Sequence, residues 1–193
     1  MRNTRGLGAA ALLVVLAACS SIPMGTAGKL RSLDYLNDDV ASLLLAFDLP
    51  PALEPIPGAS TVSFDLVTPS SGERHVKATL VVADADELAG TLPPPSGDRN
   101  YYLFGFSETD KAAIRAAQAW ARTLPPGANS MSVSLSPSLC RTEPIEPAKT
   151  TVSALIALPG APGLSPLLSN MPLSTVLAAA PNKDIPPCAG HSG

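Results

Sequence analysis

The sequence predicts an α+β fold, a mostly antiparallel sheet of five or six strands with one main helix, from about Glu108 to Leu124, packed on one face. Several short segments alternate apolar and polar residues with the period of two that half-buried strands have. Only the segment at Glu108 combines strong helical periodicity with a capping residue. The 21 prolines separate segments of strand length, which is typical of a compact domain with stiff connections.

The segment from Leu33 to Phe47 allows two interpretations. Its apolar residues fit a helical stripe. The turn-like Asn37-Asp38-Asp39 and the apolar run from Leu43 to Phe47, which Pro50 would end, indicate a strand instead. We favour the strand and leave the helix open.

A β-hairpin is predicted after this segment. Two runs with a period of two lie on either side of a Ser- and Gly-containing turn from Pro69 to Glu73, which is the pattern of a hairpin. The apolar positions of the two runs are Val62, Phe64 and Leu66, then Val76, Ala78, Leu80 and Val82.

The main helix is predicted to follow a short aromatic strand, Tyr101 to Phe106. Ser107 can cap the helix, with Asp110 at the third helical position as in a capping box. The helical spacing predicts an apolar face that packs on the sheet and an opposite face that is solvated. The apolar face holds Ile114, Ala117, Trp120, Ala121 and Leu124, and the solvated face holds Lys111, Arg115, Gln118 and Arg122.

Three further elements are predicted in the C-terminal part. Met131, Val133 and Leu135 alternate with serines, so we expect a strand with one buried and one wet face. Residues 151–158 are apolar on both sides, which indicates a central strand, and residues 172–180 fit a short helix. Gly160 and Gly163 are interpreted as a turn, because no Lys-Ser/Thr pair follows them as in a phosphate loop.

The candidate catalytic and metal-binding residues form no recognised constellation. Zinc sites need three or four ligands at close spacing, which His75 and His191 lack. His75, Asp65 and a serine could be combined into a Ser-His-Asp set, but no Gly-x-Ser-x-Gly elbow marks a nucleophile, so we interpret His75 as a solvated strand residue. The acids between Asp84 and Glu87 lack the glycine and further ligands of a calcium loop. We therefore predict no catalytic residue, metal or cofactor.

The aromatic residues are few, and most of them lie in two of the predicted elements. An aromatic patch could bind sugars or partner chains. A small domain needs its few aromatic rings for the core, so we predict a core role for them. These residues are Tyr101, Tyr102, Phe104, Phe106 and Trp120, of which Tyr102 is expected to face out.

The N-terminal segment has the three parts of a secretory signal in the correct order. Arg2 and Arg5 precede an apolar stretch from Leu7 to Ala18, which is shorter than the roughly 18 residues of a membrane span. The stretch ends in Leu16-Ala17-Ala18-Cys19, which resembles the lipobox of bacterial lipoproteins. In that family the cysteine receives a diacylglyceryl group, the preceding segment is removed and the new N-terminus is acylated. An ordinary secretory signal with a chance cysteine is the alternative.

This resemblance implies a division of the chain. Residues 1–18 are expected to be a signal peptide, 19–32 a lipidated N-terminus with a short tether, and 33–193 a single globular domain. Cys19 is the expected lipid attachment site. In lipoproteins of this kind an Asp after the cysteine tends to mean retention at the inner membrane, so Ser20 favours the outer membrane.

The two remaining cysteines, Cys140 and Cys188, form an even pair in the oxidising compartment that a lipoprotein enters. We predict that they form a disulfide. Two unpaired thiols are the alternative, and a thiol nucleophile at Cys140 is disfavoured because no His or Asn flanks it and no Cys-x-x-Cys is present.

The order of the elements around Cys140 is also similar to a group of uncharacterised lipoproteins from Gram-negative bacteria. That group implies no known activity. The elements concerned are Tyr101–Phe106, Ser107–Leu124, Ser130–Ser136 and Cys140.

The formal net charge of −3 and the absence of basic runs disfavour nucleic acid as a partner. The sequence therefore favours a non-catalytic accessory or structural module of an envelope or secretion assembly. It would be held by the lipid on Cys19 to the outer membrane, face the periplasm and bind an envelope protein. The alternative is a carrier or sensor of an apolar ligand such as a lipid, with Val62, Phe64, Leu80, Val82 and Ile156 lining its cavity.

Overall fold

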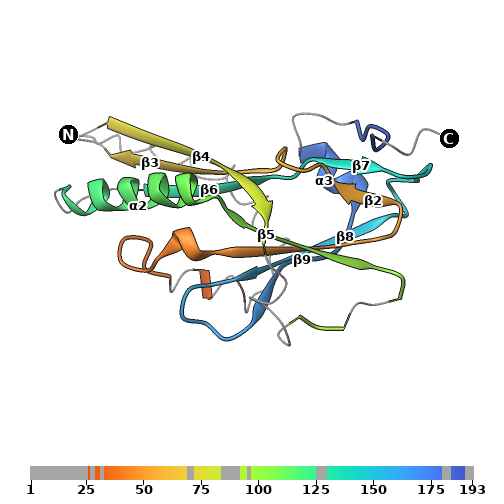
Figure 1. Ribbon diagram of the computed structural model, residues 1–193, viewed down its shortest axis with the longest axis horizontal. Coiled ribbons are helices and arrows are strands. Elements are labelled where there is room, and N and C mark those ends of the chain that lie inside the picture. The colour runs from red at the N-terminus through yellow and green to blue at the C-terminus, as the bar shows by residue number, and fades with distance from the viewer. Residues whose placement is uncertain are drawn as a thin grey trace, which may run out of the picture.

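The computed structural model describes residues 26, 29–30, 33–68, 72–83, 92–94, 97–124, 130–179 and 184–189. They form an α+β fold in which seven antiparallel strands, in the order β6-β3-β4-β5-β1-β8-β9, curl into a half-barrel, with a second sheet of β2 and β7 at one end (Figure 1). The elements are η2 (Val40–Ser42), β1 (Leu44–Leu49), β2 (Leu53–Pro55), β3 (Thr61–Thr68), β4 (Gly72–Val82), β5 (Asn100–Phe106), α2 (Glu108–Arg122), β6 (Ser130–Ser136), β7 (Leu139–Arg141), β8 (Thr151–Ala157), β9 (Leu164–Pro172) and α3 (Leu173–Ala179).

The predicted fold class and antiparallel pairing are confirmed, but the predicted number of strands is too low. The described residues contain nine strands, of which β2, β7 and β9 are not predicted from the sequence. β2 and β7 are three residues long, too short to show a period of two. β9 carries Pro166 and Pro172, which disfavour a strand except at the edge of a sheet, and β9 is an edge strand.

The ambiguous segment after Leu33 forms a short 3₁₀ turn and then a strand. The turn is η2, and β1 begins at Leu44 and ends immediately before Pro50, as the strand interpretation predicts. β1 lies between β5 and β8, and five of its six residues are buried, which explains why its sequence lacks the alternation of a half-exposed strand. β8 also lies inside the sheet, but it is next to the edge strand β9 and not at the centre.

The predicted hairpin is confirmed as β3 and β4. Val62 pairs with Ala78 and Phe64 with Val76, so the apolar positions of both strands share the concave face. β3 pairs on its other side with β6, where Phe64 is opposite Val133. The middle of the turn, residues 69–71, lies outside the described residues.

The main core fills the concave face of the sheet. Phe47 packs on Phe104 with ring centroids 5.1 Å apart, and Phe64 packs on Phe106 at 5.9 Å, as predicted for the phenylalanines. Tyr102 does not face out as expected. It is opposite Phe47 in the register between β1 and β5, so it points to the concave side and packs against the main core.

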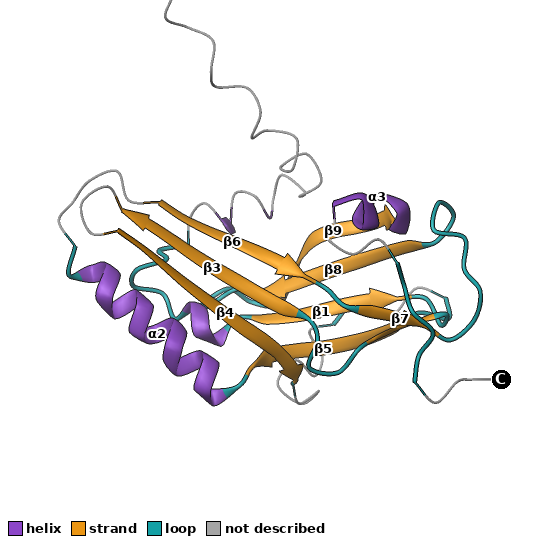
Figure 2. Ribbon diagram, turned by 90° about the horizontal axis from the view of Figure 1, so that it is seen from above, coloured by secondary structure: helices purple, strands orange, loops and turns teal. Residues whose placement is uncertain are grey.

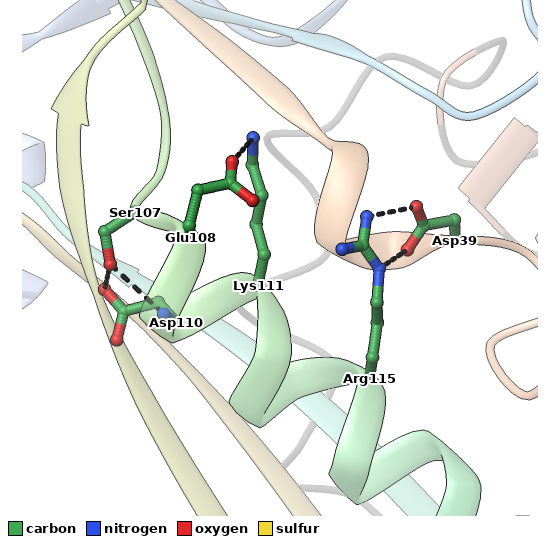
Figure 3. Close-up of polar contacts among 6 residues, drawn as sticks. All are labelled: Asp39, Ser107, Glu108, Asp110, Lys111 and Arg115. Atoms are coloured by element: carbon green, nitrogen blue, oxygen red, sulfur yellow. Dashed lines mark hydrogen bonds and ion pairs between the residues drawn. The ribbon is translucent and has the colours of Figure 1, made fainter.

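Helix α2 begins where the sequence predicts and covers the concave face over β3 and β4 (Figure 2). The backbone N–H of Asp110 donates to Ser107 Oγ at 3.1 Å, which confirms the cap (Figure 3). Asp110 Oδ2 accepts from Ser107 Oγ at 2.9 Å and from the backbone N–H of Thr79 at 3.2 Å. The carboxylate thus joins the start of the helix to β4, and it binds the Ser107 hydroxyl in place of the backbone N–H that a capping box uses.

One residue of the predicted solvated face of α2 is buried. Gln118 is only 6% exposed, and its Nε2 donates to the backbone oxygens of Tyr35 and Asp38, each at 2.8 Å. The turn before η2 packs on this side of the helix, and its backbone carbonyls need hydrogen-bond donors. The helical periodicity of α2 does not reveal this contact, because the turn lies far away in the sequence. Arg115 stays exposed and pairs with Asp39 at 2.7 Å (Figure 3).

Among the described residues, no helix combines the length and the apolar character needed to cross a membrane. The predicted signal segment and Cys19 lie outside the described residues.

Candidate functional site

The convex face of β6, β3 and β4 carries the histidine for which a catalytic role was considered. His75 Nδ1 lies 2.7 Å from Asp65 Oδ1 and His75 Nε2 lies 3.3 Å from Glu73 Oε2, with the imidazole 62% exposed. The hydrogen bond to Asp65, supported by the charges of Asp65 and Glu73, raises the pKa of His75 above 6.5. His75 is therefore a solvated strand residue, as predicted, and at neutral pH it is held between two carboxylates.

This row of side chains does not have the order of a catalytic triad. A triad needs the imidazole between the serine and the carboxylate. Here Ser132 of β6 is opposite Asp65 of β3, and Asp65 is opposite His75 of β4, so the carboxylate lies in the middle. The far nitrogen of His75 contacts Glu73 and not a hydroxyl. The row can hold a charged imidazole, but it does not activate Ser132 as a nucleophile.

The disulfide predicted between Cys140 and Cys188 is present and joins two segments that are 48 residues apart. It attaches a C-terminal strap, which we define as residues 184–189, to β7. The backbone N–H of Arg141 donates to Pro186 O, and that of Cys188 donates to Arg141 O, each at 2.9 Å. Glu54 lies close to both sulfurs, but disulfide sulfurs lack the thiolate that a metal requires. The two cysteines are therefore a covalent link between β7 and the strap, and not metal ligands.

Two cavities flank the strap. One, of about 120 Å³, lies between the strap, β7 and α3, and the other, of about 350 Å³, is open to the side of Arg141. Leu177, Asp184 and Ile185 line both, so the strap forms their common wall. The larger cavity is within the size range of small-ligand sites, which begins at about 300 Å³.

The cavity that the sequence suggested for an apolar ligand is not found where it was expected. Val62, Phe64, Leu80 and Ile156 are buried in the packed main core, and Val82 is 76% exposed. The cavity beside Phe64 measures only about 10 Å³, too small for more than a water molecule. The cause is α2, whose Ile114 fills the space over β3 and β4.

The described part of the predicted tether contacts the domain. Thr26 is buried, Lys29 Nζ donates to Ser165 Oγ of β9 at 2.9 Å, and Leu30 O accepts from the Tyr35 hydroxyl at 3.0 Å. Leu30 also packs against the main core. The chain between Cys19 and the body of the protein is thus seven residues long at Thr26, which spans at most about 25 Å when fully extended.

Sequence reasoning missed two surfaces, the cavities at the strap and the edge of the sheet at β6. The cavities exist only where the disulfide and the pairing of β2 with β7 bring distant segments together, so no local pattern in the sequence reveals them. The second had a signal, because the predicted strand contains no charged residue and no proline to protect an edge.

The remaining candidates fall into two groups. Gly160 and Gly163 adopt positive φ angles of 69° and 67° in the turn between β8 and β9, which confirms the turn interpretation. His191, the acids 84–87 and Cys19 lie outside the described residues.

Comparison with known proteins found no family model, no curated protein and no solved structure that matches this chain.

Proposed function

We propose that the protein is a lipid-anchored, non-catalytic accessory module of an envelope or secretion assembly, attached to the outer membrane and facing the periplasm. The observation that carries this proposal is the disulfide between Cys140 and Cys188. Structural disulfides form and persist in oxidising compartments, which fits export of the chain behind the segment that ends at Cys19.

The packing of the N-terminal region supports a role close to the membrane. Thr26, Lys29 and Leu30 lie against the domain, so a lipid on Cys19 would hold the body within about 25 Å of the bilayer surface. Two or more acyl chains would make this attachment stable, because each buried methylene contributes about 0.8 kcal/mol. The domain would then be held in place for binding to other envelope proteins.

The accessory role is supported by what the reactive groups do. The two described cysteines are bonded to each other, and both nitrogens of the described histidine face carboxylates. Arg99 and Asp48 form an ion pair at 2.7 Å in which both side chains are largely buried. The disulfide and the buried ion pair hold the fold together, whereas the exposed pairs of His75 contribute little to stability. This use of the reactive groups fits a rigid binding module.

The anchor is tested by replacing Cys19 with serine in the full chain. We expect the variant to remain unprocessed or to be lost from the membrane fraction after a carbonate wash, whereas the wild type stays. Normal trimming of the variant and retention in the washed membranes would overturn the anchor.

The accessory role is tested by mild cross-linking in intact cells followed by purification. We expect one envelope protein to be recovered reproducibly with the wild type and much less with Cys19→Ser, because the unanchored domain is no longer held beside its partner. Equal recovery with both forms, or no partner at all, would argue against this role.

A second candidate function is the binding of an apolar ligand, such as an acyl chain of a lipid, at the strap. It is favoured by the cavity of about 350 Å³, whose lining combines the apolar side chains of Ile145, Leu177 and Ile185 with the charged side chains of Arg141 and Asp184, as an amphiphilic ligand requires. Organic extraction of the purified protein should then release a bound lipid, and Leu177→Arg should abolish its recovery. Extraction that yields no lipid from the wild type would exclude this candidate.

A further inference from the structure

Strand β6 (Ser130–Ser136) forms one edge of the seven-stranded sheet (Figure 2). It pairs with β3 along one side over seven consecutive residues, and among the described residues no strand pairs with its other side. An edge of this kind presents a row of backbone N–H and C=O groups that can pair with another strand. Natural proteins usually protect such edges with prolines, charges, bulges or a covering segment.

The two edges of this sheet differ in that protection. The opposite edge strand, β9, contains Pro166 and Pro172, has Asn170 at a positive φ of 49°, and shifts register against β8. These features interrupt the regular ladder that an added strand would need. β6 has no proline, no charged residue and an unbroken register with β3. β6 is thus regular along its whole length.

The sequence of β6 is symmetric about its centre. It reads Ser-Met-Ser-Val-Ser-Leu-Ser, with Val133 in the middle. When two such strands run antiparallel with Val133 opposite Val133, each serine faces a serine, and Met131 faces Leu135. The pairing leaves no apolar residue opposite a polar one and brings no charges of the same sign together on β6.

The exposure of Val133 shows what such pairing would cover. Val133 is 46% exposed, although Phe64, directly opposite on β3, is 2% exposed. On β6 itself, Met131 packs beside Ala117 and Ala121 of α2 and Leu135 packs against the main core, whereas Val133 between them stays exposed. A second strand beside β6 would place a valine against Val133 on the same face.

We propose that β6 pairs antiparallel with β6 of a second copy of this chain, about a two-fold axis at Val133, and joins two half-barrels into one continuous sheet. Such an interface is isologous, as in most homodimers. The nearest strand charge, Asp65 on β3, lies about three strand spacings across and two residues along the strands from its counterpart, roughly 16 Å in all, so repulsion is largely screened. Pairing through β6 requires neither the lipid on Cys19 nor an envelope partner.

The axis is tested by cysteine cross-linking of the full chain under mild oxidation. Val133→Cys should give a covalent dimer that reductant reverses, because the two thiols would be directly opposite. Val67→Cys is the matched control, since Val67 is a strand valine of similar exposure, 40%, on β3. The control should not cross-link above the wild type. Equal dimer from both variants, no dimer from Val133→Cys, or a covalent product between Val133→Cys and a different protein would overturn the proposal.

The register is tested with two serines that would face each other across the axis. The double variant Ser132→Cys/Ser134→Cys should cross-link much more than Ser132→Cys alone, because in the proposed register residue 132 faces residue 134 of the second copy. Equal cross-linking by the single and double variants would overturn the axis at Val133.

The non-covalent dimer is tested by sedimentation of the full chain in detergent. Val133→Lys places two ammonium groups together at the axis and should weaken dimerisation about tenfold or more, whereas Val67→Lys should leave it unchanged. Circular dichroism and thermal unfolding check that both variants fold. If Val133→Lys does not fold, the cross-linking of the cysteine variants decides whether the dimer forms. A wild type that stays monomeric at all concentrations, or a dimer that Val133→Lys leaves intact, would overturn the proposal.

Discussion

The concave face of the sheet is covered in two different ways at its two ends (Figure 1). Over β3 and β4 the cover is α2, a single helix that buries Ile114, Ala117 and Ala121 through one local pattern. At the other end the cover combines α3, the sheet of β2 and β7, and the strap, which the disulfide attaches to β7. The buried residues there come from separate segments, and Leu53 lies 120 positions before Leu173, which is itself 12 positions before Ile185.

The two ends bury their apolar residues by two different physical means. Apolar residues on one helical face are brought together by the backbone itself, so the helix needs only a cap and a surface to pack on. The four segments β2, β7, α3 and the strap must each lose chain entropy before they can contact one another. A disulfide reduces that loss by constraining the unfolded chain. The end that includes the strap should therefore depend on covalent chemistry, and the end that includes α2 should not.

The largest expected effect is the loss of the disulfide. Opening a loop of 48 residues by the double substitution Cys140→Ala/Cys188→Ala should lower the free energy of unfolding by about 4 kcal/mol. Urea unfolding of the purified protein measures this loss. Reductant should destabilise the wild type similarly and leave the double variant unchanged. Equal stability of the wild type with and without reductant, with both thiols shown to be free, would contradict the comparison.

The next prediction concerns one buried side chain under each cover. Ile114→Ala under α2 and Leu173→Ala at the other end should each cost about 2–5 kcal/mol, because both side chains are almost fully buried and leave a cavity. In the double cysteine variant, the cost of Leu173→Ala should shrink while that of Ile114→Ala stays the same. Chemical unfolding in the two backgrounds gives both values. Equal changes at the two ends would show that the disulfide does not act locally.

A smaller effect is expected at Gln118. Gln118→Leu removes an amide that donates to two backbone oxygens, so about 1–3 kcal/mol of unfolding free energy should be lost. Arg122→Leu is the control, because Arg122 is exposed on the same helix. Thermal and urea unfolding compare the two variants. A Gln118 variant as stable as the control would show that water replaces the amide.

The helix cap is expected to contribute less again. Ser107→Ala removes the acceptor for the N–H of Asp110 and should cost about 1 kcal/mol. Ser107→Thr keeps a hydroxyl at this position and should restore most of that stability. Unfolding curves measured for both variants test the cap. If alanine and threonine behave alike, Asp110 would be held by Thr79 of β4 and not by the cap.

The smallest expected effect lies on the convex face, outside both covers. His75 should titrate above 6.5 in an NMR pH series, because it is hydrogen-bonded to Asp65, and Asp65→Asn should lower that value. The pKa is raised in the folded state, so the stabilisation is fully present below the unfolded value and is lost as the pH rises through the folded value. Resonances of α2 and the strap should not follow this titration. If they do, the convex face is coupled to the covers.

The elements with local signals could be predicted from the sequence. The period of two in β3 and β4, and the serine cap and apolar stripe of α2, depend on neighbours only a few residues away. The strap could be predicted only as a pairing of two cysteines, because its pockets depend on which distant segments meet there. Gln118 was misassigned for the same reason, since the carbonyls that it binds belong to residues about 80 positions earlier.

By itself, then, the sequence determined the helix, its cap, the hairpin and the cysteine pair, because backbone periodicity and the chemistry of single residues act locally. Only the tertiary structure decided that β9 and the two short strands join sheets, that the main core leaves no room for a ligand beside Phe64, and that Val133 lies uncovered at an edge. Those outcomes depend on the order of the strands and on the place of α2, which are set by the packing of the whole chain.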